Sequence, residues 1–110
     1  MIYEYRLYEA APGKMPELNA RFRDDTLRIF AKHGMKVVAF WQPMVGSVRE
    51  LHYILAWDDL AHMEASWGAM RADPEWAEIR HRTEADGALA TDIRNQLWNL
   101  TDYSPVPSAS

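Results

Sequence analysis

The sequence predicts an α+β protein with the element order β-α-β-β-α-β: a four-stranded antiparallel sheet with two helical crossovers on one face. Short segments with period-two alternation indicate strands, and longer segments with apolar residues three and four apart indicate helices. Residues 37–57 form a predicted hairpin that is apolar on both faces. Because few segments remain to cover both faces of a small sheet, we expect the second face to pair with a second copy of the chain.

Composition and charge narrow the class of protein. A chain of 110 residues with 48% hydrophobic residues is expected to form one domain with its own core. A net charge of -4 argues against nucleic-acid binding, which concentrates Lys and Arg. Glu4 and Arg6 interrupt the apolar core that a signal peptide would need, and no apolar run is long enough to span a membrane. We therefore expect a cytoplasmic protein without membrane contact.

The first strand and the first helix have clear local signals. Residues 2–9 alternate in period two, with Tyr3, Tyr5 and Leu7 against Glu4, Arg6 and Tyr8. Pro16 lies where the first helical turn should begin, because a missing N–H costs little there. The helix is expected to run to His33, and Gly34 is expected to end it as a left-handed cap.

The central hairpin is predicted from alternation on either side of a turn at residues 46–47. In its first strand, one face is expected to carry Val37, Ala39 and Trp41, and the other Val38, Phe40 and Met44. In its second strand, one face is expected to carry Leu51, Tyr53, Leu55 and Trp57, and the other His52, Ile54 and Ala56. Each face of the hairpin therefore needs cover.

The second crossover is predicted to be a helix in two pieces. An N-cap at residues 58–59 begins the first piece, and Asp73 followed by Pro74 begins the second, which Gly87 closes. Residues 88–100 form the fourth predicted strand. We expect a folded domain over residues 1–103 and an extended tail over residues 104–110 that frays at its end. The predicted element order, β-α-β-β-α-β, is the split βαβ pattern of the ferredoxin-like fold.

Several segments together resemble the NIPSNAP family, within the dimeric α+β barrel superfamily. The resemblance covers nearly the whole chain, in the segments YEYRLYEAAPGKM, KHG, FWQPMVGSVRELHYILAW, WGAMRADPEW and YSPV. It implies a ferredoxin-like protomer that pairs into a dimeric α+β barrel. The wider superfamily includes cofactor-free monooxygenases, haem-degrading enzymes and isomerases, which is an analogy of fold alone.

Metal and cofactor sites are not predicted. The chain has no cysteine, and none of the four histidines has a partner at the helical spacing of paired ligands. His62 and His81 are expected to be solvated helix residues. We therefore predict no metal and no cofactor, with a haem bound through one histidine as the less favoured alternative.

His33, His52 and Tyr5 are the candidate catalytic residues. Both histidines border apolar surface and could transfer protons near neutral pH, whereas the simpler interpretation is a helix-capping His33 and a hydrogen-bonded His52. His33 ends the first helix beside the sheet, and Tyr5 lies mid-strand. We expect His33 and Tyr5 to point into the mouth of one pocket between helices and sheet.

Aromatic residues that carry a polar group suggest one side of a ligand-binding pocket. Tyr5, Arg6, Trp41 and Tyr53 stand on neighbouring predicted strands and are our candidate ligand-binding residues, although most aromatic residues here are expected to fill the core. Arg6 could hold a ligand carboxylate, or pair with Glu4 or Glu50. We predict a homodimer that binds a small organic molecule as a cofactor-independent oxygenase or isomerase. The alternative is a non-catalytic dimeric binding or regulatory module.

Overall fold

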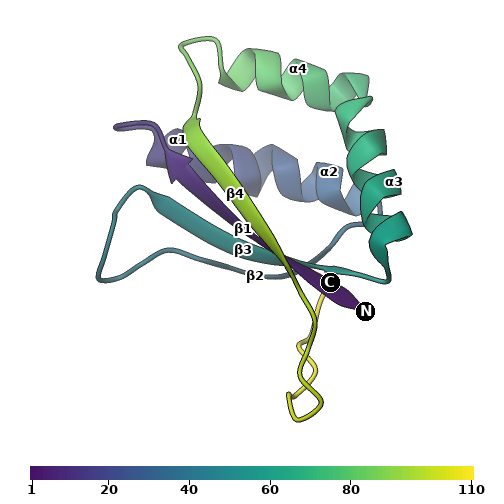
Figure 1. Ribbon diagram of the computed structural model, residues 1–110. Coiled ribbons are helices and arrows are strands. Elements are labelled where there is room, and N and C mark those ends of the chain that lie inside the picture. The colour runs from purple at the N-terminus through teal and green to yellow at the C-terminus, as the bar shows by residue number, and fades with distance from the viewer.

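The computed structural model describes residues 1–110 and contains one antiparallel sheet of four strands with a layer of helices (Figure 1). The strands are adjacent in the order β2-β3-β1-β4. In chain order the elements are β1 (Ile2–Ala10), α1 (Met15–Arg21), a π-helical turn (Phe22–Thr26), α2 (Leu27–Lys32), β2 (Lys36–Trp41), β3 (Glu50–Trp57), α3 (Leu60–Arg71), α4 (Pro74–Thr83) and β4 (Ala90–Trp98). The predicted α+β ferredoxin-like fold is confirmed.

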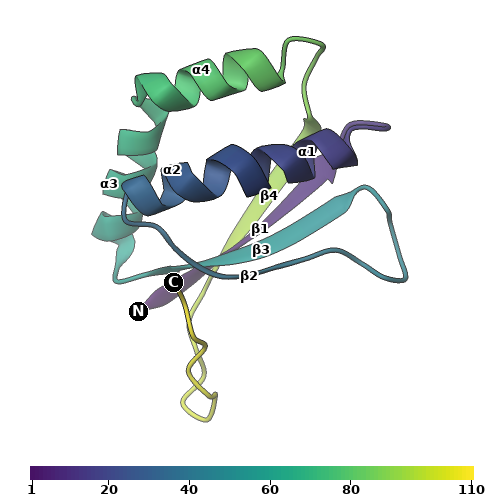
Figure 2. The ribbon, with the colours of Figure 1, turned by 180° about the vertical axis from the view of Figure 1, so that it is seen from behind.

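The helices all lie on one side of the sheet, and the opposite side carries no helix (Figures 1 and 2). The core lies between the two layers, where Phe30, Leu55 and Trp57 are almost completely buried. None of the helices is both long enough and apolar enough to cross a lipid bilayer. We call the uncovered side the open sheet face; its central residues are Tyr5, Leu7, Trp41, His52, Ile54 and Trp98.

The charged side of β1 faces the helices. Glu4 is opposite Leu55, and Arg6 is opposite Tyr53, in the register between β1 and β3. Since both of these partners are completely buried in the core, the alternation places Glu4 and Arg6 beneath the helices as well. The predicted alternation is correct, but here the polar residues of the strand are enclosed and the aromatic Tyr5 lies outside.

A register shift changes the predicted faces of β2. The pairing with β3 shifts between Val37 and Ala39, so Val38 is an extra residue in the strand. As a result, Val37 and Phe40 both pack toward the core, whereas the prediction had placed them on opposite faces. Trp41 stays on the open sheet face, where it is 49% exposed, and Trp98 there is 40% exposed. These two tryptophans therefore do not fill the core.

Local capping signals define the helices well. Asp59 accepts a hydrogen bond from the His62 N–H at the start of α3, and Asp73 accepts one from the Glu75 N–H at the start of α4, each at 2.8 Å. The two-piece second crossover is thus confirmed. The first helix begins with Pro16 in its first turn as predicted, but its middle widens into the π-helical turn of residues 22–26.

The tail ends in contact with the sheet. Ser110 exchanges two backbone hydrogen bonds with Val37 of the edge strand β2, at 2.6 and 3.0 Å, where we had expected a frayed end. The tail therefore leaves the end of β4 on one edge of the sheet and reaches β2 on the other edge (Figure 1).

Two glycines should respond oppositely to the same substitution. Gly34 has a φ of +71°, and Gly68 lies within α3; an added Cβ would meet no atom within 4 Å at either position. Gly34→Ala should therefore lose about 1–2 kcal/mol of unfolding free energy through backbone strain. Gly68→Ala should gain about 0.5–1 kcal/mol through helix propensity. Urea denaturation of both variants measures this, and equal signs would contradict the cap at Gly34.

Candidate functional site

A cavity of about 440 Å³ lies between the helices and the inner side of the sheet. Four arginines line it: Arg6 from β1, Arg21 from α1, Arg71 from α3 and Arg80 from α4. We call it the arginine-lined cavity. Its walls are largely apolar and aromatic, and they include Phe22, Phe30, Trp67, Met70, Trp76 and Ile93. The volume and the mixed lining are typical of a site for a small organic ligand.

Arg6 is fixed at the sheet side of this cavity. Its Nη1 donates to a Glu4 carboxylate oxygen at 3.0 Å, and its Nε donates to the Tyr53 hydroxyl at 2.8 Å. Its guanidinium carbon stands 4.4 Å from the centre of the Trp67 ring, within cation–π distance. Burial disfavours the Arg6 cation, but the Tyr53 and Tyr8 hydroxyls and the Glu4 carboxylate outweigh it and raise the pKa of Arg6 above its usual value. Arg6 is therefore a permanent cation here.

Tyr53 is the buried hydrogen-bond partner of Arg6. Its side chain is completely buried, and its ring packs against Phe40 with 4.8 Å between ring centroids. Burial raises the pKa of the Tyr53 hydroxyl well above its ordinary value, so this group stays protonated. Tyr53 thus serves as a hydrogen-bonding support for Arg6 rather than as an acid at neutral pH.

Arg21 supplies the second buried cation. It is 8% exposed, its Nη1 donates to Glu84 at 3.1 Å, and its Nε is buried without a hydrogen-bond partner. The Thr26 hydroxyl, also on the cavity wall, is a second buried group without a partner. Buried polar groups nearly always have partners, so these two unpartnered atoms are exceptions that single out this part of the protein. Both lie at or beside the π-helical turn, a feature frequent at functional sites.

The cavity carries a surplus of positive charge. Glu84 is its only lining carboxylate, and it is shared by Arg21 and Arg80. Glu4, outside the lining, balances Arg6. The four arginines and two carboxylates leave a net charge of +2, and Arg71 has no acidic partner among these residues, which favours an anion.

The four candidate ligand-binding residues separate into two pairs. Arg6 and Tyr53 contact one another on the helix side, and only Arg6 of the four lines the arginine-lined cavity. Tyr5 and Trp41 lie on the open sheet face, because each strand alternates its side chains between faces. Trp41 lines a smaller hollow of about 290 Å³ beside β2. The expectation of one wall formed by all four residues does not hold.

Tyr5 and His52 form a hydrogen-bonded chain on the open sheet face. The Tyr5 hydroxyl is 2.7 Å from His52 Nδ1, and His52 Nε2 is 3.0 Å from a Glu50 carboxylate oxygen. The Tyr5 ring stacks on Trp98 with centroids 4.9 Å apart. These hydrogen bonds pair the polar ends of Tyr5 and His52, but the residues around them do not line the cavity on the helix side.

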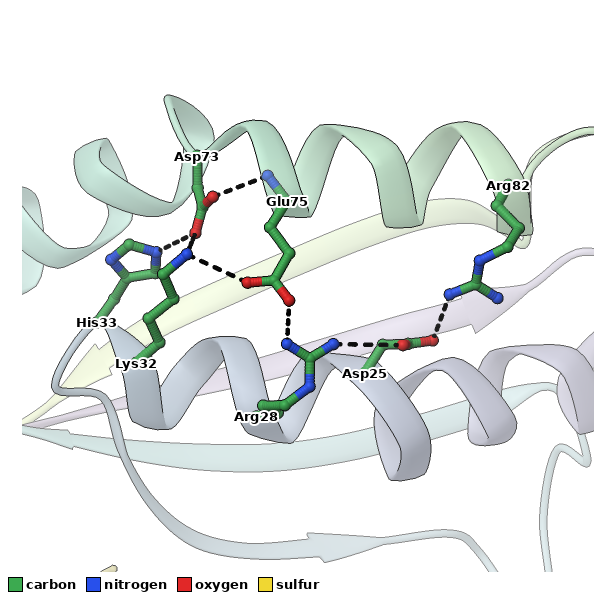
Figure 3. Close-up of polar contacts among 7 residues, drawn as sticks. All are labelled: Asp25, Arg28, Lys32, His33, Asp73, Glu75 and Arg82. Carbon is green, nitrogen blue, oxygen red and sulfur yellow. Dashed lines mark hydrogen bonds and ion pairs between the residues drawn. The ribbon is translucent and has the colours of Figure 1, made fainter.

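His33 belongs to a row of ion pairs between the first and second helical crossovers, seen in Figure 3. Its Nε2 lies 2.7 Å from an Asp73 carboxylate oxygen, which also receives Lys32 at 2.8 Å. The row, formed by Asp25, Arg28, Lys32, His33, Asp73, Glu75 and Arg82, joins the π-helical turn and α2 to α4 (Figure 3). Neither His33 nor Tyr5 lines the arginine-lined cavity, so the expectation of a shared pocket mouth does not hold.

Sequence reasoning missed most of the cavity residues. The sequence does not single out Arg21, Arg71 and Arg80, since arginines on helices usually face water. One signal could have identified Arg21: it lies three residues after Leu18 and directly before Phe22, at the edge of the buried stripe. Arg71 and Arg80 are exposed at the cavity mouth, and no spacing distinguishes them from other surface arginines.

The geometry defines an α+β protein with a ligand-sized, cationic cavity between its sheet and helices. The chain belongs to the NIPSNAP family, whose model matches residues 3–105. No curated protein matches the chain.

Solved structures share this fold. Protein Atu4242 from Agrobacterium tumefaciens is 24% identical with a TM-score of 0.84, covering 96% of this chain and 99% of its own. A Nitrosomonas europaea protein, provisionally named an antibiotic biosynthesis monooxygenase, is 10% identical with a TM-score of 0.63, covering 90% and 97%. A mutant of MhuD with two manganese protoporphyrin IX molecules per active site is 15% identical with a TM-score of 0.65, covering 98% and 100%. At these identities the likeness concerns the fold.

Asp73 should make stability sensitive to acid. Hydrogen bonds from Lys32 and His33 hold the pKa of Asp73 well below its ordinary value of 3.8. A lowered carboxyl pKa stabilises the fold above the unfolded pKa, and this contribution is lost as pH falls through the folded pKa. Asp73→Asn should therefore be less stable than wild type at pH 7, with a smaller difference at pH 3.

Urea denaturation at both pH values measures this difference in unfolding free energy. Asp59→Asn is the control, because Asp59 caps α3 without an ion pair. If the two variants lost the same stability at both pH values, the role given to Lys32 and His33 would be wrong.

Proposed function

We propose that this protein binds a small organic anion, with an aromatic or hydrocarbon body, in the arginine-lined cavity. The observation that carries the proposal is Arg21, a buried cation with an unpartnered Nε, which is a lining residue of a cavity with surplus positive charge. A carboxylate is the acceptor that an arginine fork suits best. The aromatic walls would take up the rest of the ligand.

The cavity residues support binding more than acid–base chemistry. No histidine lines the cavity, and its one carboxylate, Glu84, is held by two arginines. A general base for an isomerase or an oxygenase would need a free acceptor near the ligand. A haem in this cavity would likewise find no imidazole for its iron among the lining residues. Binding is therefore the function we propose, and catalysis is not part of it.

Arginine substitution should separate charge recognition from hydrophobic binding. We expect 2-naphthoate to raise the melting temperature, and its neutral amide to raise it less. Arg21→Gln should weaken 2-naphthoate binding about 10- to 100-fold through loss of a charge-assisted hydrogen bond, and change amide binding little. Isothermal titration measures both affinities.

Arg23→Gln is the matched control, because Arg23 lies two residues further on, is exposed and does not line the cavity. Equal losses of affinity in the two variants, or equal binding of acid and amide by wild type, would contradict anion recognition by Arg21.

We further propose that two copies pair through the open sheet face. Trp41 and Trp98, on the two edge strands, are 49% and 40% exposed, with Tyr5 and Ile54 on the strands between them. Exposed aromatic area of this kind is unfavourable in water, and a second copy brings the same apolar surface, so one interface covers both. This pairing is also what the alternative function, a dimeric binding module, requires.

A charge on the open sheet face should prevent pairing. Ile54→Asp should sediment as a monomer at about 10 µM protein, a concentration at which wild type should sediment as a dimer. Val45→Asp, at a loop position that is 94% exposed, should behave as wild type does and sediment as a dimer. Sedimentation velocity distinguishes these outcomes, and a monomeric wild type would refute the pairing.

A further inference from the structure

Glu4 is a buried carboxylate that lies behind the wall of the arginine-lined cavity. It is 1% exposed and does not itself line the cavity. Four side chains donate to its two oxygens. One oxygen accepts from the indoles of Trp57 at 3.1 Å and Trp67 at 2.9 Å, and the other from Arg6 and Asn95 at 3.0 Å each.

These donors use the carboxylate fully. Two oxygens with four good donors have little capacity left for a ligand or a solvent molecule. Glu4 therefore has no free acceptor for a substrate, and an effect on the ligand must pass through its partners. Two of the partners, Arg6 and Trp67, line the cavity.

A purely structural role explains this arrangement poorly. Burying an ion pair commonly stabilises a fold no better than apolar side chains of similar size. What the network does provide is a defined geometry. It holds the Arg6 guanidinium 4.4 Å from the centre of the Trp67 ring, so that a cation and an aromatic wall keep one relative position.

We infer that Glu4 is the positioning residue of the arginine-lined cavity, and that it fixes Arg6 and Trp67 for an anionic aromatic ligand. This inference rests on the proposed anion binding. It also explains why Arg6 is held by two protein partners before a ligand arrives, since Nε is bound to Tyr53 and Nη1 to Glu4. A pre-positioned cation loses less side-chain entropy when the ligand binds.

Glu4→Gln changes this network on one side only. The amide oxygen can replace the oxygen that accepts from Trp57 and Trp67. The amide nitrogen then faces Arg6 and Asn95, or, with the amide turned over, it faces Trp57 and Trp67, and all four of these groups are donors. The substitution should therefore release one of the two cavity-lining partners, Arg6 or Trp67, while the side-chain volume stays almost unchanged.

The first measurement needs no ligand. In wild type, the Arg6 Nε–H should give a slowly exchanging NMR signal, because it donates to Tyr53 in a buried site. An Arg6→Lys variant, which lacks this signal, assigns it. Glu4→Gln should lose the protection of the Arg6 Nε–H or of the Trp67 indole N–H, and Glu75→Gln, in the row of ion pairs of Figure 3, should keep both. Unchanged protection in Glu4→Gln would overturn the inference.

The second measurement is a double-mutant cycle on 2-naphthoate affinity. Glu4→Gln should weaken binding about tenfold in wild type and add almost nothing in a background that already lacks the released partner, Arg6→Gln or Trp67→Phe, because its effect passes through that partner. Equal losses in both backgrounds, or tighter binding by Glu4→Gln, would overturn the inference. If wild type binds no organic acid, the proposed function fails, and the NMR signal alone then decides the positioning.

If Glu4→Gln does not fold, Glu4→Asp serves as the second variant. It keeps the charge but withdraws the carboxylate by one methylene, so Arg6 protection should again fall. Full protection of Arg6 in a folded Glu4→Asp protein would count against the inference.

Discussion

The buried carboxylate of Glu4 is the interaction on which the rest of this structure depends. Its four donors come from β1, β3, α3 and β4, so one side chain connects the strands of the sheet to the helix layer. A carboxylate removed from water is unfavourable unless donors replace its hydration. The inner side of the sheet is therefore polar at its centre, and Arg6 stands there as the paired cation. Apolar helix residues cannot close over such a centre as they would over leucines, which accounts for a cavity at this position.

The two faces of the sheet consequently differ in chemistry. The helix side combines cations with aromatic walls, and Arg21 and Thr26 each keep an unpaired polar atom there. The open sheet face carries the rings of Tyr5, Trp41 and Trp98, and the polar ends of Tyr5 and His52 are hydrogen-bonded there. The proposed anion and the proposed second copy are therefore assigned to opposite sides of the sheet. The row of ion pairs between the helical crossovers, in contrast, stabilises the layer that covers the cavity (Figure 3).

Local signals in the sequence predicted the elements, whereas long-range contacts decided the site. Asp73 with Pro74 marks a helix start through its own backbone, so its place was predictable. The burial of Glu4 was not, because its indole donors are 53 and 63 residues away. The extra residue at Val38 reversed one face of β2 without a glycine or proline to mark it. The alternation of β1 predicted that Tyr5 and Arg6 face opposite ways, but it could not tell which of these two faces the helices cover.

The most direct test of the central claim is a crystal structure of the protein with bound 2-naphthoate. The account predicts the carboxylate within hydrogen-bonding distance of Arg21 or Arg6, and the rings between Trp67 and Trp76, with Arg6 still paired to Glu4. A ligand found on the open sheet face or in the hollow beside Trp41, with the arginine-lined cavity empty of it, would contradict the account.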